Sequence, residues 1–207
     1  MLKLFNNSEG CTPTKGTKFS ACVDLYARED VVIKAGETVL IPLGVMIDNE
    51  AIEKKVAEKY SFDLGEIKDS NEYDKYHPLF REVEDFYMKH QFNLQIRSSM
   101  SAKYGLIIAN GTGIIDMDYN REIMICIHKP FRFSDMWKVP VDFILDVTFG
   151  KDRTNKSFSR FKLKKGEVDK KGKRIAVAQI GLIRNETYLL GIDSKDKRDG
   201  GFGSTNS

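Results

Sequence analysis

A short stretch near the middle of the chain combines the residue types that a hydrolytic site needs. Asp116 and Tyr119 stand three residues apart, directly after a glycine-bearing turn that includes Gly113. A carboxylate at a tight turn can polarise a water molecule, and an aromatic ring beside it can pack on a ring of a bound ligand. Residues 122–127 follow as a largely apolar predicted strand. The stretch therefore predicts a site at the tip of a β-hairpin.

Two further groups of residues suit the binding of an anion. Arg97, Ser98 and Ser99 combine a permanently charged planar guanidinium with two hydroxyl donors, which suits phosphate or carboxylate groups. The segment 197–205 is rich in glycine, which permits close approach of the backbone to phosphates. The alternative for Arg97 is a structural ion pair with a carboxylate.

Strand signals dominate the regions that would position these residues. Short apolar runs at 31–33, 39–41 and 45–47 are separated by turns that contain glycine or proline, and runs at 123–127 and 175–183 continue the pattern. Regularly spaced short strands predict an all-β fold, either a β-barrel or a jelly roll.

Two segments interrupt this pattern as predicted insertions. In the first, at about 49–91, apolar residues recur at helical spacing, so we expect a helical hairpin whose helices begin near Asn49 and Pro78. It is either a packing appendage or an element that binds a partner or covers the site. In the second, at about 129–157, strict alternation at 139–149 predicts an extra β-hairpin.

The composition favours one globular domain. The 207 residues suit a single domain over 1–196, insertions included, with 197–207 as a flexible arm, and the hydrophobic content of 41% is enough for a core. The formal net charge of +3 is too small to indicate nucleic-acid binding. One basic run is either a solvated loop or a phosphate-attracting rim; it comprises Lys162, Lys164, Lys165, Lys170, Lys171, Lys173 and Arg174.

The cysteines and the hydropathy pattern bear on the compartment. Three widely spaced cysteines indicate neither a disulfide framework nor a zinc site. No run of about 18 apolar residues is present, which argues against a membrane span. We therefore expect a cytoplasmic protein, or one in the equivalent reducing compartment of a host cell.

In this order, the segments at 21–27, 96–102, 113–119 and 200–205 resemble motifs one, two, three and five of the trimeric dUTPases (deoxyuridine triphosphate nucleotidohydrolases). The fourth motif, at 172–179, is altered. The resemblance covers roughly residues 16–48, 92–128 and 158–205. It implies a distorted jelly-roll or β-barrel fold, a homotrimer, and Mg²⁺-dependent hydrolysis of dUTP to dUMP and pyrophosphate. Each active site would take motifs from different subunits.

The resemblance also implies roles for individual residues around the nucleoside. Asp116 would hold the water that attacks the α-phosphate in line. Tyr119 would pack on the deoxyribose and exclude a 2′-hydroxyl. Uracil would be read by Asn110 and by the backbone of the hairpin that ends at Met124, including Gly113, Ile114 and Ile115. Asn110 with Gly111 is equally a good hairpin turn in its own right.

The remaining implied roles concern the phosphates and the metal. Arg97, Ser98 and Ser99 would meet the phosphates, and Asp24 would approach Mg²⁺ through water. Gln179 stands two residues from the family's glutamine position in the altered fourth motif. Because side chains alternate along a strand, a shift of two residues would keep the Gln179 side chain on the face that meets the site. The terminal arm would close over the nucleotide with Lys197, Arg198, Gly201, Phe202, Gly203, Ser204 and Thr205, where Phe202 would stack on the uracil.

Two rival functions stay open at this point. A dCTP deaminase shares the fold and an Arg-Ser-Ser segment, and it needs a glutamate at the pyrimidine ring, for which Glu122 is in the right region. A regulatory module that binds a protein partner through residues 49–91 is the other.

Overall fold

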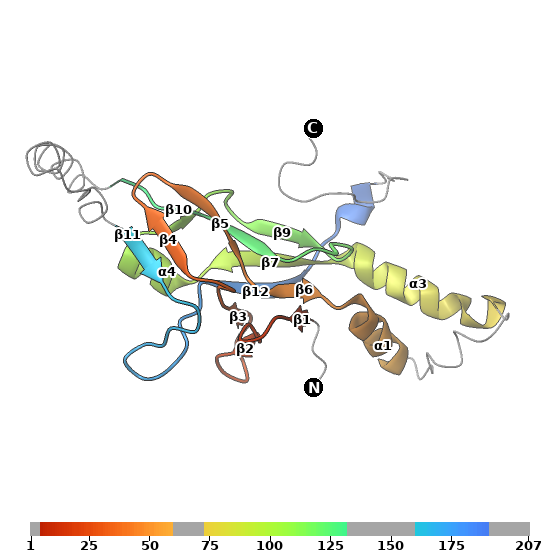
Figure 1. Cartoon of the computed structure of the whole chain (residues 1–207). Helices are drawn as coiled ribbons and strands as arrows, with labels where there is room; N and C mark the ends of the chain where they lie inside the picture. The colour runs from red at the N-terminus through yellow and green to blue at the C-terminus, as the bar shows by residue number, and fades with distance from the viewer. Residues whose placement is uncertain (1–4, 60–72, 132–159, 191–207) are drawn as a thin grey trace, which may run out of the picture.

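The computed structural model of the chain describes residues 5–59, 73–131 and 160–190 (Figure 1). The first half contains six strands, namely β1 (Phe5–Asn7), β2 (Thr14–Lys15), β3 (Val23–Leu25), β4 (Val31–Lys34), β5 (Thr38–Pro42) and β6 (Val45–Ile47). Two helices follow, α1 (Asn49–Lys59) and α3 (Tyr73–Lys89). The rest contains β7 (His90–Ile96), α4 (Ser98–Tyr104), β8 (Ile107–Ile108), β9 (Gly113–Asp116), β10 (Met124–His128), β11 (Arg160–Leu163), β12 (Ala178–Arg184) and the short 3₁₀ helix η1 (Thr187–Leu190).

The strands pair into four sheets, and every pairing between them is antiparallel. The largest sheet has the order β2-β3-β12-β7-β9, a second has the order β5-β10-β8, and β1-β6 and β11-β4 are two-stranded. The prediction of an all-β, jelly-roll type fold is confirmed. The barrel alternative is wrong for the described residues, because their sheets do not close on one another.

The core lies between the sheets and follows the alternation of the strands. In β10 and the residue before it, Ile123, Ile125 and Ile127 are fully buried, while the residues between them are half-buried. Ile41 on β5 lies opposite Ile125 and is also buried. Because successive side chains of a strand point to opposite faces, this register places one face of the sheet in the core.

The predicted helical hairpin is present as α1 and α3, which contact each other and extend away from the strands (Figure 1). Its predicted ends need correction. Asp48, not Asn49, caps α1, since its carboxylate accepts the N–H of Ala51 at 3.0 Å. Helix α3 begins at Tyr73, five residues before Pro78, so the proline is not the first helical residue. Most of the predicted β-hairpin at 129–157 lies outside the described residues.

Strand β7 is an inner strand of the largest sheet. It pairs with β12 on one side and with β9 on the other. Residues 91, 93 and 95 share one face of this sheet, because Phe92 and Leu94 between them are buried in the core. Within the described residues, no helix has the length and apolar character that crossing a membrane requires.

Candidate functional site

An ion pair at one end of β7 organises the first part of the site. A guanidinium nitrogen of Arg97 lies 2.8 Å from a carboxylate oxygen of Asp24, whose side chain is 5% exposed. The same nitrogen donates to the amide oxygen of Gln179 at 3.3 Å. The sheet register explains this meeting, because Gln179 is opposite Asp24 on β3 and opposite Gln95 on β7. Three predicted site residues that are distant in sequence therefore lie together.

Gln179 reaches this cluster although the strand that carries it starts later than expected. The apolar run 175–183 predicted a continuous strand, whereas β12 begins at Ala178. Val177 still donates its N–H to Leu25 and accepts the N–H of Arg97, so the preceding chain stays attached to the sheet. The amide of Gln179 also donates to Gln95 at 3.3 Å, which fixes its orientation.

The two serines of the predicted phosphate-binding segment begin helix α4. Arg97 is the N-cap residue, in an extended conformation, and its carbonyl accepts the N–H of Met100 at 2.9 Å. The first N–H groups of a helix have no partner within the helix, so Ser98 and Ser99 offer backbone donors as well as hydroxyls. The helix ends at Gly105, whose φ of 66° suits a left-handed cap.

A cavity of about 570 Å³ opens beside this ion pair. It is lined by Asp24, Arg97, Ser99, Met100, Lys103, Tyr104, Val168, Asp169, Lys170, Lys171, Lys173, Arg174, Ile175 and Ala176. Six of these side chains are cationic and two are carboxylates. A hollow with this excess of positive charge attracts anions.

Several of these lining residues were not among the predicted site residues. Lys103 lies four residues after Ser99 on α4, a spacing that places both on one side of a helix. The lysines at 170, 171 and 173 belong to the basic run for which a solvated loop and a phosphate rim were both open. The run by itself could not show which of its members face a cavity.

Asp116 and Tyr119 lie at the other end of β7. Asp116 is the last residue of β9, opposite Gln91, and its carbonyl accepts the N–H of Tyr119 at 3.1 Å. Tyr119 is 6% exposed, and its hydroxyl donates to the carbonyl of Glu122 at 3.2 Å. Burial raises the pKa of this hydroxyl. The short turn thus ties the backbone of Asp116 to that of Tyr119, whose buried ring is held in place by its hydroxyl.

The residues predicted to read a base lie between β8 and β10, which pair antiparallel through Ile108 and Ile127 and so close the expected hairpin at its base. Strand β9 pairs with β7, whereas β10, which starts at Met124, pairs with β5 and β8. Burial explains this choice of partners for β10, because its isoleucines Ile125 and Ile127 are fully buried in the core. Asn110 and Gly111 are exposed in the turn between β8 and β9, where Gly111 has a φ of 77°. Gly113 is buried, Ile115 is half-buried and Ile114 is 57% exposed.

The two halves of the predicted site are far apart within one chain. Asp116 lies opposite Gln91, and Arg97 follows six residues further along β7. At about 3.3 Å per residue, this separates them by about 20 Å along the strand. Both lie on the same face of the sheet, since residues 91, 93 and 95 alternate with buried ones and Arg97 reaches Gln179 on that face. One chain therefore presents two separated half-sites.

Glu122 has structural partners. One of its carboxylate oxygens accepts the N–H of Gly44 at 2.8 Å, and the other lies 2.9 Å from a guanidinium nitrogen of Arg28. A side chain held in this way is poorly placed to shuttle protons at a pyrimidine ring. The geometry disfavours the deaminase alternative.

The remaining predictions concern the metal and the terminal arm. No group of three or more His, Cys, Asp or Glu residues with the arrangement of a metal site occurs in the part of the chain that the structure describes. Asp24 has one carboxylate oxygen on Arg97 and the other 4.0 Å from the ammonium of Lys173. The predicted arm residues, from Lys197 to Thr205, lie outside the described residues.

The fold and the site define a jelly-roll protein with a cation-lined cavity at one end of its main sheet and a carboxylate–tyrosine turn at the other. Comparison with known proteins refines this class. A deoxyuridine 5′-triphosphate nucleotidohydrolase of Rickettsia akari is 29% identical over 126 residues, 60% of each chain, and one of Rickettsia felis is 30% identical over 128 residues with the same shares. Over about 60% of its length the chain is thus similar to proteins of the dUTPase family.

Further matches extend over most of the chain. The corresponding protein of Nautilia profundicola is 24% identical over 199 residues, 96% of this chain and 93% of the relative. The dUTPase from phage phi11 of S. aureus superimposes with a TM-score of 0.50 at 17% identity over 97% of both chains. The Staphylococcus bacteriophage 80alpha dUTPase superimposes with a TM-score of 0.50 at 16% identity, over 97% of this chain and 89% of the phage protein. No protein-family model matches, and the chain spans about 60% of the length of the two Rickettsia relatives.

Proposed function

We propose that the protein hydrolyses dUTP to dUMP and pyrophosphate. The observation that carries this proposal is the placement of a cation-lined cavity and the Asp116–Tyr119 turn on one face of the same sheet. Hydrolysis between the α- and β-phosphates needs cations for the phosphates, a carboxylate for the water and a pocket for the nucleoside. The names of the curated relatives agree with this reaction.

In the proposed mechanism, each half-site has its own task. Asp116 accepts a proton from water and aims it at the α-phosphate. The ring of Tyr119 closes the side of the sugar where a 2′-hydroxyl would stand, while Asn110 and the backbone near Gly113 receive the uracil. Arg97, with Ser98 and Ser99, neutralises and orients the phosphates.

We propose a homotrimer in which each active site draws on more than one copy. The separation of about 20 Å between Asp116 and Arg97 supports this, because the α-phosphate of one dUTP molecule must be reached from both sides. A second copy of the chain can supply the missing half-site. The arm residues from Lys197 onward would complete the pocket.

Mg²⁺ is the proposed metal. The described residues fit an ion that arrives bound to the triphosphate, because Mg²⁺ keeps several of its waters and needs few protein ligands. Asp24 would accept a hydrogen bond from a metal-bound water through the carboxylate oxygen that faces Lys173. When bound, the ion would neutralise charge on the phosphates.

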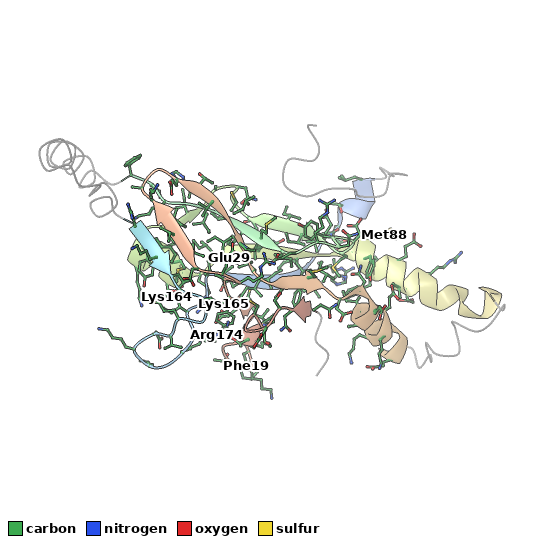
Figure 2. All side chains as sticks on the ribbon, viewed as in Figure 1. Phe19, Glu29, Met88, Lys164, Lys165 and Arg174 are labelled. Atoms are coloured by element: carbon green, nitrogen blue, oxygen red, sulfur yellow. The ribbon has the colours of Figure 1, made fainter. Side chains whose placement is uncertain are left out.

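The test is pyrophosphate release from dUTP, dCTP, dTTP and UTP with Mg²⁺, for the unaltered chain, Asp116→Asn and the control Glu29→Gln. Glu29 is an exposed carboxylate that does not line the cavity (Figure 2). We expect release from dUTP alone, a loss of at least about a hundredfold in Asp116→Asn, and no change in Glu29→Gln. No release from any nucleotide, or equal activity of Asp116→Asn, would refute the proposal. Ammonia release from dCTP would instead identify a deaminase.

A protein partner at the helical hairpin is the second proposal, because α1 and α3 extend beyond the sheets (Figure 1). Replacing residues 49–89 by a short linker should abolish capture of a partner while hydrolysis persists. Joint loss of folding and activity would show that the hairpin only supports packing.

The proposed compartment for hydrolysis and partner binding is the cytoplasm or a host's reducing compartment, since Cys11, Cys22 and Cys126 are all free thiols.

A further inference from the structure

We propose that Glu122 is a positioning residue that fixes the preference of the site for deoxyribose over ribose. It acts through Tyr119, whose ring it holds in place, and Arg28 supports it. This inference deepens the proposed function and rests on it for the place of the Tyr119 ring beside the sugar. The proposed mechanism gives the two charged residues no other part.

The ring of Tyr119 takes its position from the backbone of residue 122. The Tyr119 hydroxyl donates to the carbonyl of Glu122 at 3.2 Å, and the Tyr119 N–H donates to the carbonyl of Asp116 at 3.1 Å. The Tyr119 side chain is 6% exposed and belongs to the hydrophobic core. Because the hydroxyl stands at the far end of the ring, a displaced Glu122 carbonyl would tilt the whole ring.

The carboxylate of Glu122 has both of its oxygens engaged. One accepts the N–H of Gly44 at 2.8 Å, and the other lies 2.9 Å from a guanidinium nitrogen of Arg28. Hydrogen bonds to a charged carboxylate are shorter and stronger than those between neutral groups. Bonds to two different partners therefore hold residue 122, and with it the carbonyl that Tyr119 uses.

Both partners of this carboxylate belong to the frame around the turn between β5 and β6. Gly44 lies in that turn with a φ of 64°, and its carbonyl accepts the N–H of Ser8 at 2.7 Å. The N–H of Arg28 donates to the carbonyl of Pro42 at 2.9 Å. The carboxylate thus ties the turn before β10 to a part of the fold that is itself fixed by backbone hydrogen bonds.

The backbone bonds of Ile123 separate this turn from the strand that follows it. Residues 117–123 belong to no strand. The N–H of Ile123 donates to the carbonyl of Val45 at 2.8 Å, and its carbonyl accepts the N–H of Leu43 at 3.1 Å. Removal of the Glu122 carboxylate should therefore loosen the turn and leave β10 in its sheet. This predicts a change in selectivity without a loss of the fold.

Exclusion of a hydroxyl by an aromatic ring is sensitive to small displacements of that ring. A site rejects the wrong ligand through a clash, and the clash is relieved when the wall moves. Since dUTP has no 2′-hydroxyl, its binding should change less than that of UTP. A substitution that only weakens the fold would lower the activity toward both nucleotides by the same factor. The ratio of the two activities therefore separates a positioning role from a structural one.

The test uses variants of the whole chain. Glu122→Ala removes both bonds of the carboxylate, Glu122→Gln keeps an acceptor for the N–H of Gly44, and Arg28→Gln removes the positive charge alone. The matched control is Glu37→Ala, because Glu37 accepts the N–H of Lys34 at 2.8 Å and lies 3.6 Å from its ammonium nitrogen. Calorimetric titration with dUMP and UMP gives the preference without hydrolysis. Pyrophosphate release from dUTP and UTP gives it during turnover, and thermal melting checks that each variant folds.

We expect Glu122→Ala to lower the preference for dUMP over UMP, and for dUTP over UTP, by about tenfold. Glu122→Gln should recover most of the preference. Arg28→Gln should lower it by about threefold, as suits a partly exposed ion pair, and Glu37→Ala should leave it unchanged. An unchanged preference in Glu122→Ala, or an equal fall in Glu37→Ala, would overturn the inference.

The proposed function fails or stands on a different result. If the unaltered chain does not hydrolyse dUTP but its preference for dUMP falls in Glu122→Ala, hydrolysis is refuted and the positioning role is upheld. If dUTP is hydrolysed and Glu122→Ala keeps the full preference, the positioning role alone is refuted.

Discussion

The ion pair between Arg97 and Asp24 should be one of the stronger polar interactions of the fold. Its atoms are 2.8 Å apart, and Asp24 is 5% exposed while Arg97 is 33% exposed. At that distance the Coulomb energy is about 1.5 kcal/mol in bulk water and about 6 kcal/mol at an effective dielectric constant of 20. Desolvation of the buried carboxylate offsets much of the larger value, so we expect a net coupling of about 2 kcal/mol.

A double-mutant cycle measures this coupling. Asp24→Asn, Arg97→Gln and the double variant are unfolded in urea, and the coupling is the departure of their free energies from additivity. The single Asp24→Asn change should lower the melting temperature by about 4 to 8 °C for a chain of this size. All samples need one protein concentration, because the melting of an oligomer depends on it.

The exposed pair Lys55–Glu58 on α1 is the matched control. Its atoms lie 3.1 Å apart, but its side chains are 61% and 45% exposed, so its coupling should be about 0.3 kcal/mol. A coupling below about 0.5 kcal/mol for Arg97 and Asp24, or one no larger than that of the control pair, would show that burial does not strengthen the interaction. The assignment of Asp24 as the residue that holds Arg97 in place would then fail.

Three further predictions concern stability. Gly44→Ala should lower the free energy of unfolding in urea by about 2 to 4 kcal/mol, because φ is 64° and a Cβ would lie 2.6 Å from the sulfur of Cys11. The control Gly166→Ala, with a φ of 73° and open space around it, should lower it by only about 1 to 2 kcal/mol. Tyr87→Phe should leave the free energy of unfolding unchanged or raise it by about 1 kcal/mol, because no described residue is hydrogen-bonded to this buried hydroxyl; a clear loss would contradict that. Burial, with the nearby charge of Glu53, raises the pKa of Tyr87 from 10.0 to about 12. The contribution of the protonated hydroxyl to the free energy of unfolding is therefore fully present below pH 10.0 and is lost as the pH rises toward about 12. Melting curves should show this loss, and Tyr87→Phe should remove it.

Local features of the structure could be predicted from the sequence because their causes are local. The strands at 31–33, 39–41 and 45–47 are bounded by turn residues next to them in the chain, and the structure has β4, β5 and β6 there. The helical spacing at 49–91 likewise predicted α1 and α3. Their ends were less accurate, since both Asp48 and Asn49 are good capping residues and the sequence does not distinguish them.

Pairing between distant strands could not be predicted in the same way. The turn-forming pair Asn110 and Gly111 does make a turn, but the strands on either side of it belong to different sheets, since β8 pairs with β10 and β9 pairs with β7. The meeting of Arg97 with Asp24 depends on β12 lying between β3 and β7. Such contacts are set by the packing of the whole core, which one sequence does not display.

The span of β7 has a genetic consequence. If each active site takes one end of β7 from one subunit and the other end from a neighbouring subunit, a substitution at either end impairs active sites that also contain unaltered subunits. An allele altered at Asp116 would then be partly dominant over an unaltered one. An allele altered at Asp116 and another altered at Arg97 would restore some activity to each other when expressed together, since some of their mixed assemblies would contain one intact pair of ends.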